Sequence, residues 1–366
     1  MRGFVPRSCS HALGALGVFV VLVGSLALTS CSGWVEFRHD ASHTGFDATQ
    51  AQLGPGAASR LVRHWTQSVG SAIDSSPAIS LGGTLTVGSR DGNLRAFNST
   101  TGAPAWTAGT DGAVPSSPAW NGSSVYVGAA NGRLYAFDGA KGSRLWSAST
   151  GGAVSAPASS ASDVYVGSTD GRVYAFADGN GAPAWSAPTF GAVKSSPALG
   201  SFLFVGSDDH RVYAFDSKNG ALKWSAATGG PVESSPAVVN NVLYVGSNDG
   251  KVYAFDATTG AERWAATTAG PVDSSPAVSN GSVYVAGEDG ELRSLDSATG
   301  APQWTSALGS GAFSSAAVAD GVVYVGTRAG RVDAFNTVNG APIWSDATGG
   351  PVLSSPAEQN GLVYVG

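Results

Sequence analysis

Cysteine is nearly absent from this chain, which has two in 366 residues, Cys9 and Cys31. Both stand within the first 31 residues, so the remainder has no disulfide, no cysteine-ligated metal and no thiol nucleophile. Charged residues are also scarce, at 13%, and no run of lysine and arginine occurs. With a net charge of −6, the chain lacks the basic footprint of a nucleic-acid-binding protein, and we expect no nucleic-acid partner.

Glycine, by contrast, is abundant, with 51 residues, and many of them stand in Asn-Gly or Asp-Gly pairs. Such pairs are typical of tight hairpin turns, because both residues tolerate positive φ angles. Glycine does not recur every third residue, which excludes a collagen-like chain. An apolar content of 43% and ten tryptophans are too high for a disordered chain. The composition therefore favours a folded protein with many turns.

The first 31 residues have the features of a bacterial lipoprotein signal peptide. Arg2 and Arg7 precede the uncharged apolar run from Ala12 to Leu28, and Thr29 and Ser30 lead into Cys31. This ending resembles a lipobox, in which the cysteine receives a diacylglycerol before the leader is cleaved. We predict residues 1–31 to be the signal peptide with its lipobox and Cys31 to be the lipidated residue. An uncleaved anchor is the alternative, since the run is just long enough to span a bilayer.

Tryptophans recur along the rest of the chain at intervals of 39 to 41 residues. A fixed period near 40 indicates a repeat architecture. The recurring positions are Trp65, Trp106, Trp146, Trp185, Trp224, Trp264, Trp304 and Trp344.

Each period contains four short segments with the composition of β-strands. In one copy these are a Ser-Ser-Pro-Ala-Val segment, the run 242–246, the run 252–256 and a segment ending at Trp264. Asn280-Gly281 in the next copy and Asp249-Gly250 in this one mark hairpin turns between successive strands. Four antiparallel strands in about 40 residues are the unit of a β-propeller blade. The predicted fold is therefore an all-β propeller.

Seven complete blades are predicted between Ser75 and Trp344, followed by two strands of an eighth. The segment Leu61–Trp65 is predicted to close the eighth blade as its last strand, with the C-terminal strands supplying the first two. The third strand is missing, either because the sequence stops within a repeat, the option we favour, or because another segment fills the gap. The predicted organisation is a signal peptide at 1–31, an N-terminal linker and cap at 32–60 and a propeller at 61–366.

The phrase Ala-x-Asp-x-x-Thr-Gly-x-x-x-Trp, complete at 254–264, resembles the tryptophan-docking motif of the quinoprotein (PQQ-like) propellers, which have eight blades. The resemblance implies that the eight tryptophans dock neighbouring blades together and bind no ligand. Enzymes of that superfamily bind pyrroloquinoline quinone and calcium beneath a pair of adjacent cysteines. This chain has no such pair, and its loops are too short for a cofactor lid. We therefore expect no cofactor, no catalytic residue and no metal site. Binding of the quinone with calcium, or of another small ligand, is the alternative.

The stretch from Trp34 to Phe46 resembles a segment that precedes the propeller in secreted members of this superfamily. We interpret it as a cap packed on the propeller and expect Trp34→Ala to cost much less stability than Trp224→Ala. His39, Asp40 and His43 are conceivable metal ligands, but no third convergent ligand is evident in the sequence.

Residues needed in every blade are structural, so a binding site is sought where the copies differ. One such position precedes the Ser-Ser pair of each inner strand, and another is the turn between the second and third strands. Both should surround the same mouth of the central channel. Arg95, Arg293 and Asp333 replace a recurrent tyrosine, and we expect the arginines to reach solvent or pair with carboxylates. The candidate partner-binding residues are Asp74, Lys194, Asp209, His210, Glu233 and Asp273.

Size, lipobox and blade type together resemble the BamB-type lipoproteins of outer-membrane protein assembly. The resemblance implies a non-enzymatic, membrane-anchored scaffold of the cell envelope that binds other envelope proteins. We expect an exported monomer, tethered to the outer membrane facing the periplasm, or to the outer face of the cytoplasmic membrane in a cell without an outer membrane.

Overall fold

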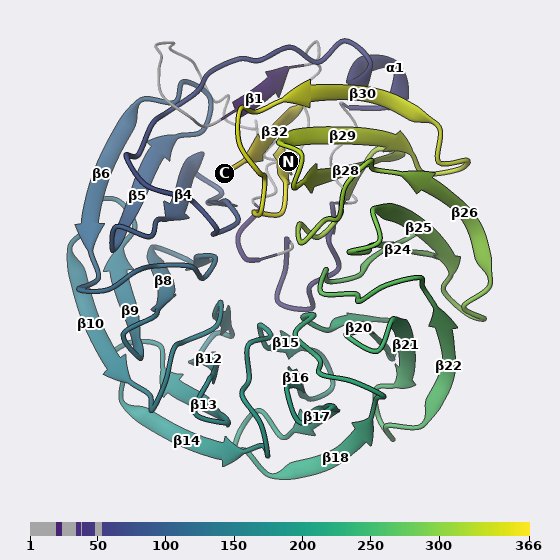
Figure 1. The fold of residues 1–366 in the computed structure, drawn as a ribbon. Helices are drawn as coiled ribbons and strands as arrows, with labels where there is room; N and C mark the ends of the chain where they lie inside the picture. Colours follow the sequence, from purple (N-terminus) through teal and green to yellow (C-terminus); the bar gives the residue numbers. More distant parts are fainter. Residues whose placement is uncertain (1–19, 24–33, 38, 48–52) are drawn as a thin grey trace, which may run out of the picture.

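The computed structural model describes residues 20–23, 34–37, 39–47 and 53–366. Seven antiparallel blades of four consecutive strands each stand around a central axis, as in a propeller, and the sheet of the seventh has β2 as a fifth strand (Figure 1). The predicted all-β propeller of four-stranded blades is thus confirmed. No helix among the residues described is both long and apolar enough to cross a membrane.

The blades follow one another along the chain, and each runs from an inner strand at the axis to an outer strand at the rim. Blade 1 consists of β3 (Ala78–Ile79), β4 (Thr84–Gly88), β5 (Asn93–Asn98) and β6 (Pro104–Gly109). Blade 2 consists of β7 (Ala119–Asn121), β8 (Ser124–Ala129), β9 (Arg133–Asp138) and β10 (Arg144–Ser149). Blade 3 consists of β11 (Ala158–Ser159), β12 (Asp163–Ser168), β13 (Arg172–Ala177) and β14 (Pro183–Pro188). Blade 4 consists of β15 (Ala198–Leu199), β16 (Leu203–Ser207), β17 (Arg211–Phe215) and β18 (Leu222–Ala227).

The remaining blades repeat the pattern. Blade 5 consists of β19 (Ala237–Val239), β20 (Val242–Ser247), β21 (Lys251–Asp256) and β22 (Glu262–Thr267). Blade 6 consists of β23 (Ala277–Ser279), β24 (Ser282–Ala286), β25 (Glu291–Asp296) and β26 (Pro302–Ala307). Blade 7 consists of β27 (Ala317–Ala319), β28 (Val322–Thr327), β29 (Arg331–Asn336) and β30 (Pro342–Ala347). The last sheet contains β31 (Ala357–Gln359), β32 (Leu362–Val365) and β1 (Val20–Val23).

The docking tryptophans connect each blade to the next. The indole N–H of Trp224 in blade 4 donates to the carbonyl of Ala257 in blade 5, at 3.0 Å. Equivalent bonds run from Trp106 to Gly139, Trp146 to Asp178, Trp185 to Ser217, Trp264 to Ser297 and Trp304 to Thr337. These bonds tie the outer strand of one blade to the next blade and help to fix the angle between them.

An eighth four-stranded blade is not confirmed. Leu61–Trp65 forms no strand of any sheet in the described part of the chain. The strand beside β32 is β1, which pairs with it antiparallel from Val20↔Val365 to Val23↔Leu362. It occupies the position where the third strand was predicted to be missing. Leu61–Trp65 instead docks through several hydrogen bonds. The Leu61 carbonyl accepts the indole N–H of Trp344, Arg63 pairs with Asp346 of blade 7, and Trp65 donates to the Ser99 carbonyl of blade 1.

The stretch Trp34–Phe46 lies inside the ring, where it contacts the ends of the inner strands (Figure 1, purple). Backbone N–H groups of Ile79, Trp120, Leu199, Val238, Val278 and Val318 donate, in that order, to carbonyls of Trp34, Val35, Ala41, Ser42, Thr44 and Gly45. The stretch ends as β2 (Phe46–Asp47), which pairs parallel with β27. It therefore closes one end of the channel, and we name residues 34–46 the plug.

Our expectation for Trp34 is wrong, because its side chain is only 2% exposed and packs with Ile79 and Tyr364 in a buried cluster. The three conceivable metal ligands of the plug have other contacts. His39 Nδ1 lies 3.3 Å from the Asp40 carboxylate, and the buried His43 ring contacts the Pro236 carbonyl. Among the residues described, no group of three His, Cys, Asp or Glu side chains is arranged to hold a metal.

Candidate binding site at the open mouth of the channel

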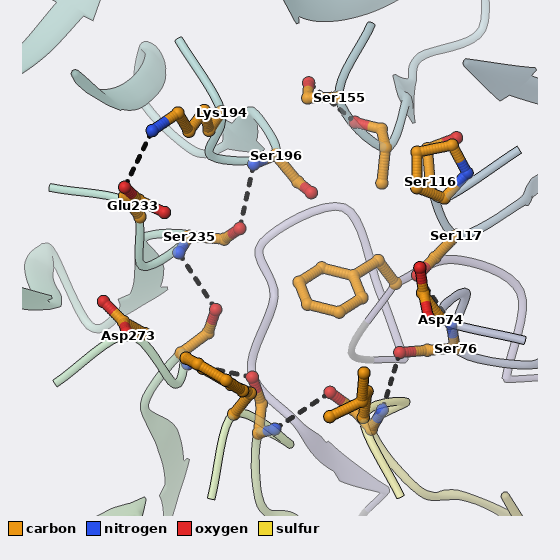
Figure 2. A pocket seen from close by; sticks show the side chains of 18 of the residues that line it. Asp74, Ser76, Ser116, Ser117, Ser155, Lys194, Ser196, Glu233, Ser235 and Asp273 are labelled. Atoms are coloured by element: carbon orange, nitrogen blue, oxygen red, sulfur yellow. Dashed lines mark hydrogen bonds and ion pairs between the residues drawn. The ribbon is translucent and has the colours of Figure 1, made fainter. Parts of the chain in front are cut away.

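The end of the channel opposite the plug is an open pocket of about 310 Å³ (Figure 2). Its lining comes from the start of each inner strand, so every blade supplies equivalent positions. Asp74, Lys194, Glu233 and Asp273 line it, as predicted for the residue that precedes each Ser-Ser pair. Phe37 of the plug also lines the pocket. The site is thus a blind pocket that reaches the plug at its inner end.

The repeated Ser-Ser pairs make the wall of this pocket. The first serine of a pair bonds within its own blade, as where the Gly246 N–H donates to Ser234 Oγ at 3.0 Å. The second serine bonds to the preceding blade, because its hydroxyl accepts a backbone N–H from the equivalent serine there (Figure 2). These bonds run from Ser76 to Ser117, Ser196 to Ser235, Ser235 to Ser275, Ser275 to Ser315, Ser315 to Ser355 and Ser355 to Ser76.

A chain of charges lies on one side of the mouth, on blades 4 and 5. The Lys194 ammonium is 2.8 Å from carboxylates of both Asp208 and Glu233. These two hydrogen bonds raise the pKa of Lys194, whose side chain is still 44% exposed. Each carboxylate keeps oxygens beyond those it gives to the lysine, and the buried Oδ1 of Asp208 has no hydrogen-bond partner. The site therefore presents both charges to an incoming group.

Asp273 is the next charged residue around the ring, on blade 6. Burial, with the nearby charges of Glu233 and Glu288, raises the pKa of Asp273 to about 6. Its Oδ1 is buried and has no hydrogen-bond partner. Burying an ionised carboxylate oxygen without a hydrogen-bond donor costs free energy. Asp273 therefore contributes to the mouth a half-buried carboxyl group that ionises less readily than an exposed aspartate.

Further ion pairs complete the rim on blades 7 and 1. Arg328 contacts Glu288 at 2.8 Å and stacks over the Phe313 ring, 3.6 Å from its centroid. On blade 1, Arg90 pairs with Asp74 at 2.5 Å. The Arg90 and Arg328 side chains are 60% and 42% exposed, so the guanidinium groups remain accessible to a partner.

Asp209 and His210 do not line the pocket. The Asp209 carboxylate accepts hydrogen bonds from the Tyr213 hydroxyl of its own blade and from the Phe190 backbone N–H of blade 3, so it ties its turn to the preceding blade. Asp249 does the same with Tyr253 and the Gly229 N–H, which makes this aspartate a repeated structural residue. His210 is exposed at the turn position that other blades fill with glycine, with a φ of 66°.

The arginines that replace the recurrent tyrosine take over its hydrogen bond. Arg95 contacts Asp91, and Arg293 contacts Asp289, each four residues earlier. These aspartates are equivalent to Asp249, so an arginine and a tyrosine serve alike as the donor to this turn carboxylate. Asp333 is itself paired with Arg331 at 2.8 Å. The expected pairing with carboxylates is confirmed, and these residues belong to the blade interior.

Sequence reasoning missed three residues of the mouth. Phe313 stands at the position of Asp74 and Lys194 in blade 7, where an uncharged aromatic side chain gives no charge signal. Asp208 is equivalent to Arg90, Glu288 and Arg328, and a strict alignment of the blades identifies it. No pattern in the sequence predicts that Phe37 lines the pocket, because its position depends on the path of the plug through the channel.

The mouth does not fit a quinone held with calcium. Hard cations need several oxygen ligands on one point, and the described residues bring no three carboxylates together for one. Lys194 is already engaged by the two carboxylates beside it. The inner end of the pocket is lined by Phe37 and serine hydroxyls, and no tryptophan lines it.

Comparison with known proteins fits this arrangement. The family model described as outer membrane protein assembly factor BamB matches residues 62–201, 169–250, 208–351 and 295–366, which together cover the whole propeller. The chain belongs to this BamB family. No curated protein sequence matches the chain.

Solved structures show the same fold. BamB from Moraxella catarrhalis is 22% identical, with a TM-score of 0.69 over 80% of this chain and 93% of that one. A europium-containing methanol dehydrogenase reaches a TM-score of 0.79 at 14% identity, over 89% of this chain and 87% of its own. The quinohemoprotein alcohol dehydrogenase from Comamonas testosteroni reaches 0.74 at 15% identity, over 91% and 80%. At such low identities the likeness establishes the fold and not an activity.

Proposed function

We propose that the chain is a lipid-anchored, non-enzymatic propeller of the cell envelope whose open channel mouth binds another envelope protein. The observation that carries the proposal is the mouth itself. Blades that otherwise copy one another differ there, and the residues that differ are charged, accessible and brought together by the ring. Membership of the BamB family supports a role in the assembly of outer-membrane proteins.

The proposed anchor is Cys31, which lies outside the described residues, as does most of the predicted leader. Of residues 1–31 only β1 is described. Cleavage before Cys31 would remove β1 and leave the edge of β32 without that partner. Cys31→Ala should therefore block both lipidation and processing and leave a precursor that retains residues 1–30. A variant that is still processed and still acquires a labelled lipid would contradict the anchor.

The mouth is tested by capture of partners from membranes that express the chain. Changing Lys194, Glu233 and Asp273 together to alanine should weaken capture and leave the melting temperature nearly unchanged. Lys194 and Glu233 are accessible charges that each contribute within about 0.5 kcal/mol of zero, and ionisation of the half-buried Asp273 does not stabilise the fold. The matched control changes Lys141 and Lys218, which are exposed in turns at the plugged end. If the control loses capture and the triple variant keeps it, the partner binds at the plugged end and the proposal is contradicted.

A parallel titration with pyrroloquinoline quinone and calcium addresses the alternative function. The proposal expects no saturable spectral change and no dye-linked alcohol oxidation. Saturable binding with turnover would favour a quinoprotein oxidoreductase over a scaffold.

A further inference from the structure

The two ends of the channel differ in a way that the sequence repeats do not. We name the plugged end, with the turns that surround it, the closed face, and the end with the pocket the open face. On the closed face, Trp34 is fixed because its carbonyl accepts the Ile79 N–H at 2.7 Å and its side chain is 2% exposed. The chain therefore enters the propeller at a defined point close to the axis.

Only Ser32 and Gly33 separate Trp34 from Cys31. Three residue steps span at most about 11 Å of extended chain. A lipid on Cys31 would have its glycerol at the membrane surface, so Trp34 would stand within about that distance of the headgroups.

This reach is too short for other orientations of the ring. The open face lies one strand length away from Trp34, and β28 with its six residues spans about 20 Å. The outer strands lie three strand spacings from the inner ones, about 14 Å before side chains are added. A tether of about 11 Å cannot reach the membrane if the open face or the outer edge of the propeller is turned toward it.

We propose that the closed face lies against the membrane and that the open mouth points away from it. The inference rests on the lipid anchor of the proposed function. Leu81 and Val338 project from turns of the closed face and are 64% and 84% exposed, but Phe190 of the open face is 91% exposed, so the orientation rests on the short tether and not on apolar exposure. The Thr337 N–H bonds the Gly321 carbonyl, so the Val338 turn lies beside the end of the inner hairpin of blade 7.

The experiment uses the lipidated full chain in phosphatidylcholine vesicles that contain a lipid with a spin-labelled headgroup. Processing leaves Cys31 as the only cysteine, and its thiol is blocked by lipid, so one added cysteine takes a fluorophore cleanly. Val338→Cys labels the closed face. Phe190→Cys labels the open face, where that side chain is 91% exposed. We expect severalfold stronger quenching at 338 than at 190. Equal quenching, or stronger quenching at 190, overturns the orientation.

A second variant tests the tether. A flexible Gly/Ser linker of about 12 residues between Ser32 and Gly33 adds up to about 40 Å of reach. It should lower quenching at 338 toward the value at 190, and unchanged quenching at 338 would contradict the short-tether argument. Flotation with vesicles separates the two proposals. A chain that does not float fails as a lipoprotein, and both proposals fall. A chain that floats without the difference in quenching loses only the orientation.

Discussion

Trp224 lies against Gly260 of the next blade, and the pair shows why the repeat keeps both residues. A Cβ on Gly260 would stand 2.6 Å from the Trp224 ring, and the glycine also has a φ of 74°. Any other residue would be strained by its backbone and would collide with the indole. The glycine of the motif is thus required by a neighbouring blade as well as by its own turn.

Two tryptophan truncations compare the blade contact with the plug. Trp224→Ala should lower the free energy of unfolding by about 3–5 kcal/mol, because it opens a cavity between blades. Since Trp34 is buried to the same degree as core residues, Trp34→Ala should cost a similar amount. Urea titration gives both values, with Phe190→Ala as the control that should change little. A loss for Trp34→Ala as small as the control's would mean that the plug does not pack in solution.

Glu36 of the plug gives the protein a pH dependence. Its side chain is 3% exposed, and burial raises its pKa to about 7 despite hydrogen bonds from Ser159. The folded state therefore holds a proton that the unfolded state releases between about pH 4.5 and 7. The free energy of unfolding should fall as the pH rises through this window.

Glu36→Gln removes that ionisation. The variant should exceed the parent in stability by up to about 3 kcal/mol above pH 7 and match it below pH 4.5. Urea titrations at pH 4.5 and pH 8 measure the difference. A difference that is the same at both pH values would show that ionisation of Glu36 is not its cause.

At the scale of elements, the Ser-Ser pair is a joint with two functions. Its first serine fixes the inner strand to the second strand of the same blade, and its second serine fixes the blade to its neighbour. In blade 3 the second position is Ala156, which offers Ser117 no hydroxyl. The inner ring therefore tolerates the loss of this hydroxyl in one blade.

Single substitutions can remove one hydroxyl from the ring of Ser-Ser pairs or supply the one that is missing. Ser275→Ala removes the acceptor of the buried Ser235 N–H and should cost about 1–3 kcal/mol. Ala156→Ser supplies a hydroxyl at the interrupted position and should add up to about 1 kcal/mol. Thermal and urea unfolding of the two variants give the comparison. Equal and small changes of one sign would show that the serine ring contributes nothing to stability.

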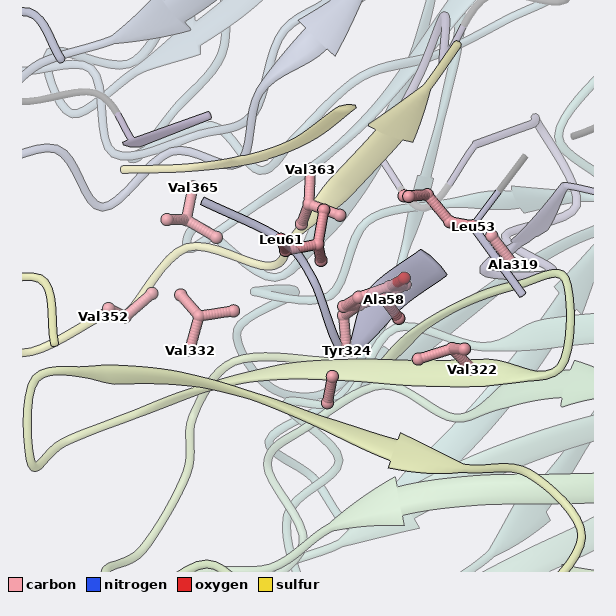
Figure 3. Close-up of a cluster of buried hydrophobic side chains, with 11 residues drawn as sticks. Leu53, Ala58, Leu61, Ala319, Val322, Tyr324, Val332, Val352, Val363 and Val365 are labelled. Atoms are coloured by element: carbon pink, nitrogen blue, oxygen red, sulfur yellow. The ribbon is translucent and has the colours of Figure 1, made fainter. Parts of the chain in front are cut away.

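At the scale of the whole molecule, segments from both ends of the chain join blade 7 to blade 1. Leu53, Ala58 of the short helix α1 (Pro55–Ala58) and Leu61 pack against Val363 and other residues of blade 7 and β32 (Figure 3). Trp344 and Trp65 add the hydrogen bonds described above. The ring is closed here by the three-stranded sheet of β31, β32 and β1 together with this irregular segment.

The plug contacts seven blades, six through its backbone carbonyls and blade 3 through the Glu36 side chain, which makes its effect measurable by hydrogen exchange. Deleting residues 34–46 should speed exchange at the six inner-strand amides that donate to it, while amides in the middle of β20 and β21 stay protected. The melting temperature should fall as well. Uniform acceleration across all strands would mean that the deletion unfolds the propeller and that the plug is part of its folding unit.

The blades could be predicted from the amino-acid sequence. Strand alternation, Asn-Gly and Asp-Gly turns and the tryptophan at a 40-residue spacing are local signals, so each blade could be predicted from its own residues. Lys194, Glu233 and Asp273 were also found from sequence, because equivalent positions of a closed ring must converge.

Only the tertiary structure decided what depends on the path of the chain through space. It placed the plug in the channel, Phe37 in the pocket and Trp34 in the core. It separated Asp209, which ties its turn to the preceding blade, from Asp208, which contacts Lys194. It also filled the place beside β32 with β1 and left Leu61–Trp65 outside the sheets. Contacts between residues far apart in the chain have no local pattern, because their energy arises only when the ring brings those residues together.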